Sequence, residues 1–96
     1  MRQELDLLRT RLPAVATLLR KRYGATRVVL FGSLAWGEAH ATSDADLAIS
    51  GVGAADAGVA TADAEALLGR TVELFLLEEL PASLRARVLT DGQELS

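Results

Sequence analysis

The strongest constraint on the fold is a change of hydrophobic period along the chain. Leucines and valines between residues 5 and 19 recur at steps of three and four, which is typical of an amphipathic helix. Arg27–Phe31 is instead short and β-branched, and Asp44–Ser50 alternates with the two-residue period of a strand. A third strand is expected at Thr71–Leu77. We therefore predict an α+β fold, with a small mixed sheet of about three strands flanked by helices.

The first helix has one clear end and one ambiguous start. Gly24 follows the last apolar position of the helical stripe and is expected to be its C-cap. Pro13 lies inside the stripe, where a proline lacks the N–H that an interior helical position donates. Either the regular helix begins near residues 10–12 after a short turn, or one longer helix is kinked at Pro13.

Glycine and proline also divide the second half of the chain. Residues 51–58, GVGAADAG, are expected to form a flexible connection, followed by an alanine-rich helix that ends at Gly69. Pro81 is expected to open a short helix. Residues 91–92, Asp-Gly, are expected to make a terminal turn.

Length and composition favour one domain over residues 1–96. The chain is 50% hydrophobic, which is enough for a single core in a chain of 96 residues. It has no cysteine, which excludes disulfides, thiolate metal sites and a cysteine nucleophile. No stretch approaches the roughly 20 apolar residues that span a bilayer, and the first residues do not resemble a signal peptide. We expect a soluble, cytoplasmic protein without a membrane partner.

The charge is unevenly distributed, although the net value is only −3. Seven arginines and lysines lie in residues 1–27, while the rest of the chain is acidic. An acidic domain offers little to a phosphate backbone, so we expect no direct nucleic-acid binding. The basic N-terminal segment is interpreted as a solvated helix face, with a partner-binding patch as the alternative.

Gly32-Ser33 stands between the strand at residues 27–31 and a short helical segment that follows it. Free backbone N–H groups and the positive end of a helix dipole would meet an anion there. Glycine allows close approach of a phosphate, and the Ser33 hydroxyl can add a hydrogen bond. Taken alone, the pair is more typical of an ordinary turn, and only its context favours a phosphate site.

Asp44 and Asp46 share one face of their strand, because successive side chains alternate between faces. Two carboxylates so placed would repel each other unless a cation lay between them. Magnesium suits such a site, and two such ions about 4 Å apart clamp both oxygens of an in-line displacement at phosphorus. The alternative is that Asp44 caps a turn and Asp46 faces solvent on an edge strand.

The string LFGSLAWGEAHATSDADLAIS resembles the G-S-x10-D-x-D signature of the DNA polymerase β-like nucleotidyltransferase superfamily. The spacing from Ser33 to Asp44 matches in full, and the resemblance extends over nearly all of the chain. The short length is similar to that of the minimal nucleotidyltransferase branch. The resemblance implies a polymerase β-like core.

The resemblance also implies residue roles. Gly32 and Ser33 would hold the triphosphate of ATP, and Asp44 and Asp46 would bind Mg2+ as catalytic carboxylates. Family members often carry a third carboxylate, usually aspartate, on a later strand, and Glu73 falls at that position. Glu73 would emerge beside the aspartates if its strand is their neighbour. The alternative for Glu73 is an exposed strand residue.

Two stretches depart from the family pattern. Many relatives have G-S-R-A-R-G, whereas Leu34 and Trp36 replace the two arginines here. Trp36 is interpreted as a packing residue, with an interface or base-stacking role as the alternative. His40, in the loop between the motif halves, is interpreted as a solvent-exposed residue.

The implied function is that of the antitoxin in a toxin–antitoxin pair. Such proteins are encoded beside a HEPN-domain ribonuclease toxin, with which we expect a hetero-oligomer, and transfer AMP from ATP to a toxin tyrosine. The alternative motivated by Glu73, Leu34 and Trp36 is a degenerate antitoxin that acts by occlusion alone. A third hypothesis is transfer to a small molecule such as an aminoglycoside, although those enzymes usually carry an additional helical domain.

Overall fold

A four-stranded mixed sheet forms the centre of the computed structural model, which describes residues 2–32, 35 and 44–95, with side chains from residue 10 onward. The strand order is β3-β2-β1-β4, with β1 at Arg27–Phe31, β2 at Ala45–Ser50, β3 at Val72–Leu76 and β4 at Gln93–Glu94. β1 is antiparallel to β2 and to β4, whereas β2 and β3 are parallel. The expected α+β class is confirmed, and β4 is an addition that the sequence pattern does not predict.

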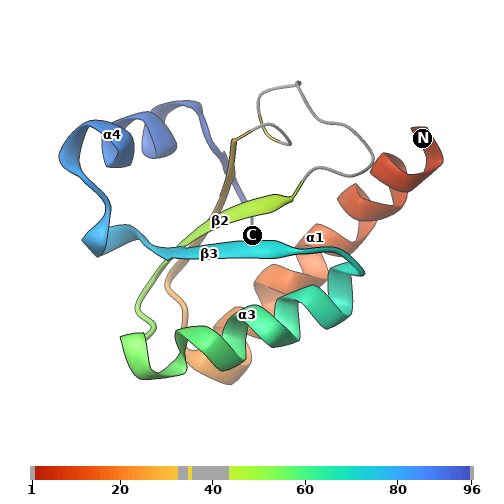
Figure 1. Cartoon of the computed structure of the whole chain (residues 1–96), viewed down its shortest axis with the longest axis horizontal. Helices are drawn as coiled ribbons and strands as arrows, with labels where there is room; N and C mark the ends of the chain where they lie inside the picture. The colour runs from red at the N-terminus through yellow and green to blue at the C-terminus, as the bar shows by residue number, and fades with distance from the viewer. Residues whose placement is uncertain (1, 33–34, 36–43, 96) are drawn as a thin grey trace.

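Helices α1, Arg2–Tyr23, and α3, Ala54–Leu68, cover one face of the sheet (Figure 1). The main core lies between these helices and the strands, and it includes the β2 side chains that the alternation assigns to one face, Ala45, Leu47 and Ile49. These three side chains are fully buried. The two-residue period of β2 therefore decides which side chains contact the helices.

The 3-10 turn η1, Leu77–Glu79, and helix α4, Ala82–Asp91, lie over the opposite face (Figure 1). A second apolar cluster fills that layer with Val29, Phe31, Ala48, Leu77, Leu80 and Val88. Phe31 and Phe75 contact each other there with ring centroids 5.5 Å apart. Both faces of the sheet are thus covered, which explains why the alternate β2 residue Ala48 is as buried as its neighbours.

The first helix is the longer of the two expected alternatives, because α1 runs through Pro13. Pro13 is exposed, so its ring contacts solvent rather than the core. Gly24 ends the helix as predicted, with φ of +77°. Its N–H donates to the Arg20 carbonyl at 3.1 Å, the single bond of the αL C-cap motif, and the Ala25 N–H donates to the Leu19 carbonyl at 3.2 Å.

The expectation of a flexible connection over residues 51–58 is wrong for its second part, because α3 begins at Ala54. The Asp56 N–H donates to the Gly53 carbonyl at 3.0 Å, and Asp56 places a negative charge in the first turn, where the helix dipole favours it. The high helix propensity of alanine outweighs the cost of one interior glycine. Gly69 ends α3 as predicted, with φ of +73°.

The C-terminal residues form more than the expected turn. α4 continues through Asp91, and the Gly92 N–H donates to the Val88 carbonyl at 2.9 Å. The chain then pairs with β1, and the Leu95 N–H donates to the Val28 carbonyl at 2.8 Å. A strand of two residues is too short to carry a periodic signal, so only its contact with β1 defines it.

Several basic residues of the N-terminal region bind elsewhere in the chain. Arg20 donates to the Leu95 carbonyl at 2.9 Å, Arg22 pairs with Asp63 at 3.3 Å, and the strand residue Arg27 pairs with Glu94 at 2.7 Å. These contacts give at least part of the basic segment a structural role. None of the helices within the described residues has the length and apolar character to cross a membrane.

Candidate functional site

The ends of three adjacent strands bring the expected site residues into one row. Phe31, the last residue of β1, lies opposite Asp46 of β2, and Asp46 lies beside Glu73 of β3. The Ala45 N–H donates to the Thr71 carbonyl at 3.0 Å, which fixes the register between β2 and β3. Residues directly opposite each other in a sheet point to the same face. The expected proximity of Glu73 and Asp46 is therefore found.

Gly32 follows Phe31 and lies against the side chain of Asp46. Its φ is +77°, a left-handed value that other residues rarely adopt. A Cβ at this position would be less than 3.0 Å from Asp46 Oδ2 and 3.2 Å from its Cγ. Glycine is thus favoured here for two reasons, and the second, contact with the carboxylate, is not visible in the motif.

The electrostatics at Asp46 reflect this crowding. Asp46 is half-buried, whereas Asp44 and Glu73 are exposed. Burial raises the pKa of Asp46 above its ordinary value, and the negative charges of Glu73 and Asp44 raise it further. A cation near these carboxylates would offset the repulsion and lower the pKa of Asp46.

The donor set fits magnesium, which prefers oxygen ligands. Within the described part of the chain, no three acidic or histidine side chains are arranged closely enough to enclose a metal by themselves. A nucleotide-dependent magnesium site does not need such a cage, because Mg2+ is commonly held by one or two carboxylates together with substrate phosphates and water. Asp46, with Asp44 and Glu73 beside it, provides such a partial set.

The phosphate side of the site is described only in part. The Ala35 N–H donates to the Gly32 carbonyl at 3.1 Å, whereas the other residues of the expected helical segment fall outside the described part of the chain. Ser33, the second half of the expected phosphate-binding pair, lies outside the described residues, as do Leu34, Trp36 and His40. The expectations for these four residues therefore stay predictions.

The chain matches the family model described as Polymerase beta, Nucleotidyltransferase over residues 14–96. The chain belongs to the polymerase β nucleotidyltransferase family. The matched range contains the entire row of site residues.

Solved structures extend this family relationship. A candidate minimal nucleotidyltransferase is 38% identical, with a TM-score of 0.79 and 92% of each chain covered. A toxin–antitoxin crystallised with AMP-PNP is 25% identical, with a TM-score of 0.78, over 88% of this chain and 72% of the other. The toxin–antitoxin MntA-HepT shares the fold at 21% identity, with a TM-score of 0.72 over 92% and 71%. No curated protein sequence gives a significant match.

One contact beside this candidate site was not anticipated from the sequence. The Glu65 carboxylate, on α3, accepts a hydrogen bond of 2.9 Å from the N–H of Val72, one residue before Glu73. It anchors the first residue of β3 to the preceding helix. The seven-residue separation has no local signature, so only the turn at Gly69 that folds β3 back along α3 creates the contact.

Proposed function

We propose that this protein is the nucleotidyltransferase antitoxin of a toxin–antitoxin pair, and that it transfers AMP from ATP to a tyrosine hydroxyl of a HEPN ribonuclease partner. The observation that carries the proposal is the row of Gly32, Asp46 and Glu73 on adjacent strand ends. Family membership supports nucleotidyl transfer. The 25% identical toxin–antitoxin crystallised with AMP-PNP supports the nucleotide and the class of partner.

The glycine and the carboxylates have different tasks in this proposal. The Gly32 backbone, which has no side chain to exclude a phosphate, holds the triphosphate together with Ser33. Asp44, Asp46 and Glu73 would hold magnesium. When bound, that ion neutralises charge on the phosphates and on the leaving group. The half-buried Asp46 is held in position by β1 and β3, and the exposed Glu73 lies on the side open to an acceptor.

The proposed reaction is an in-line displacement at the α-phosphorus of ATP. The tyrosine oxygen forms a bond to that phosphorus, and the bond to the oxygen bridging the α- and β-phosphates breaks. Pyrophosphate leaves with the electron pair of that bond. The tyrosine proton passes to a site carboxylate, for which Glu73 is best placed because it is exposed beside Asp46.

The test is transfer to the protein encoded by the neighbouring gene. The purified pair is incubated with magnesium and ATP labelled at the α-phosphate, and the partner is analysed by mass spectrometry for addition of one AMP to a tyrosine. We expect transfer with the wild type, none with Asp44→Asn/Asp46→Asn, and full transfer with the matched control Asp56→Asn on the surface of α3. Absence of transfer by the folded wild-type protein would overturn the enzymatic proposal.

Occlusion without catalysis is the second candidate, favoured by the exposed Glu73, which stands where family members usually carry aspartate. In this function binding alone neutralises the toxin, whereas in the enzymatic function the transferred AMP does. If Asp44→Asn/Asp46→Asn still binds the partner and protects cells from it as fully as the wild type, occlusion is sufficient. If that variant binds but no longer protects, transfer is required. Glu73→Asp, which restores the usual residue, should retain transfer, whereas Glu73→Gln should lose most of it.

A further inference from the structure

The outer strand β3 has an open edge. In a parallel ladder, alternate residues direct both backbone groups to one neighbour. Because the Thr71 carbonyl accepts from Ala45, the odd-numbered residues of β3 face β2, and Val72, Leu74 and Leu76 direct their N–H groups outward. The outward N–H of Val72 is bonded by Glu65. No partner for the outward N–H groups of Leu74 and Leu76 is seen within the described residues.

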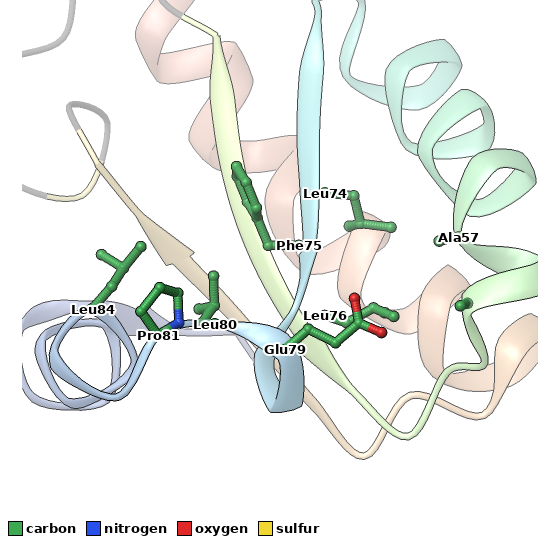
Figure 2. A pocket seen from close by; sticks show the side chains of 9 residues that line it. Ala57, Leu74, Phe75, Leu76, Glu79, Leu80, Pro81 and Leu84 are labelled. Carbon is green, nitrogen blue, oxygen red and sulfur yellow. The ribbon is translucent and has the colours of Figure 1, made fainter.

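An apolar groove of about 520 Å³ runs along this edge. Its floor is β3, with the half-buried side chains of Leu74, Phe75 and Leu76. Ala57 of α3 lies on one side and Leu84 of α4 on the other (Figure 2). Side chains of alternate strand residues thus point to either side of an unpaired backbone edge. This is the arrangement that an added extended peptide uses, with backbone hydrogen bonds for affinity and flanking pockets for side chains.

The groove carries negative charge. Among the described residues that line it, the one charged side chain is Glu79, at the end of the groove where η1 follows β3. Glu73 lies exposed on β3 toward the other end. The guanidinium of nearby Arg85 donates to the Leu80 carbonyl at 3.0 Å and keeps its positive charge, so the two carboxylates Glu73 and Glu79 outnumber this one cation. A basic occupant is therefore favoured over an acidic one.

We propose that the β3 groove binds an extended segment of a partner protein, rich in alternating apolar and basic side chains, as an additional strand of the sheet. A second copy of this chain is a poorer occupant, because β3-to-β3 pairing would place Glu73 and Glu79 of both copies in one interface. The docking itself does not require nucleotidyl transfer, so it goes beyond the proposed function. A docked segment would also run beside Glu73, close to where an acceptor hydroxyl must arrive.

The test uses two fluorescein-labelled seven-residue peptides of alternating valine with lysine and of alternating valine with glutamate. By fluorescence anisotropy, we expect saturable binding of the lysine peptide. The glutamate peptide should bind at least ten-fold more weakly. Hydrogen exchange followed by NMR should slow at the amides of Leu74 and Leu76 when the lysine peptide is added.

A matched pair of variants on α3 locates the binding. Ala57→Arg places a long cationic side chain in the groove and should weaken the lysine peptide at least ten-fold, whereas Ala62→Arg, which adds the same charge at an exposed position outside the groove, should change its Kd by less than two-fold. Circular dichroism confirms that both variants are folded.

The proposal would be overturned by no binding of the lysine peptide, equal binding of the two peptides, equal effects of the two arginine variants, or slowed exchange confined to other amides. Concentration-dependent protection of Leu74 and Leu76 without peptide would assign the groove to a second copy instead. Because this assay contains no nucleotide, its failure leaves the proposed transfer standing, and failure of the transfer assay leaves the groove standing.

Discussion

Replacement of Gly32 by alanine tests the central contact of the site, and Gly24 provides a matched control. Both glycines have φ of +77°. They differ in their surroundings, because a Cβ at Gly24 has nothing within 4 Å, whereas a Cβ at Gly32 would lie less than 3.0 Å from Asp46 Oδ2. The two substitutions therefore share their backbone strain, and only Gly32→Ala must also displace the carboxylate.

The expected losses of stability follow from the backbone strain and from the displacement of the carboxylate. The left-handed conformation costs alanine about 1–2 kcal/mol, and the smaller entropy of the unfolded chain offsets about 0.4–1 kcal/mol of that. Gly24→Ala should thus lower the free energy of unfolding by roughly 1 kcal/mol. For Gly32→Ala, displacement of Asp46 from its rotamer adds about 0.5–1.5 kcal/mol, which gives a total of roughly 2 kcal/mol. In a domain of this size, each kcal/mol corresponds to about 4–8 °C in Tm.

Urea unfolding followed by circular dichroism measures the free energies, and an Asp46→Ala background isolates the contact. In that background the blocking atoms are absent, so Gly32→Ala should cost the same as Gly24→Ala. The coupling between the two sites should be roughly 1 kcal/mol, within the range seen for residues in contact. Equal costs for Gly24→Ala and Gly32→Ala in the wild-type background, with no coupling, would refute the inferred contact.

Three further changes probe the surrounding structure. The pKa of Asp46 is raised in the folded protein, so ionisation of this side chain lowers the stability as the pH rises from the ordinary value of 3.8 through the folded value. Asp46→Asn should therefore raise the Tm of the magnesium-free protein at pH 7 and change it little near pH 3. An equal effect at both pH values would contradict the proposed repulsion. Gly92→Ala should lower the free energy of unfolding by about 1–3 kcal/mol, because a Cβ there would lie 2.7 Å from Val29 Cγ1 and closer still to the Val88 carbonyl. The control Gly58→Ala, in open space on α3, should raise the free energy of unfolding by about 0.5–1 kcal/mol. A change of the same sign in both variants would contradict this packing. Glu65→Ala should lower the free energy of unfolding by about 1–3 kcal/mol and speed amide exchange at Val72, because it removes the acceptor of that N–H. Glu65→Gln keeps an acceptor oxygen and should lower the free energy of unfolding by less. Unchanged exchange at Val72 in Glu65→Ala would show that the hydrogen bond is absent in solution.

The local sequence was sufficient to predict the elements that carry the site. The two-residue period of β2 assigned Ala45, Leu47 and Ile49 to one face, which α1 and α3 cover in the structure, and the same alternation placed Asp44 and Asp46 together on the other. Gly24 and Gly69 ended α1 and α3 as expected, because a left-handed C-cap is a local requirement that glycine meets best. The sequence predicted less where two local preferences conflicted. At Pro13 the helical period conflicts with the missing N–H of proline, and at the start of α3 the helix propensity of alanine conflicts with that of glycine.

Only the tertiary structure decided how these elements meet. The sequence could place Glu73 beside Asp46 only on the condition that their strands are neighbours, and the parallel pairing of β2 with β3 satisfies that condition. The contact of Gly32 with Asp46, the need for glycine at position 92 beside β1, and the open edge of β3 likewise depend on residues far apart in the chain. Periodicity indicates which face of an element is buried. Strand order depends on how separate elements pack together, so the sequence of one strand does not indicate which strand lies beside it.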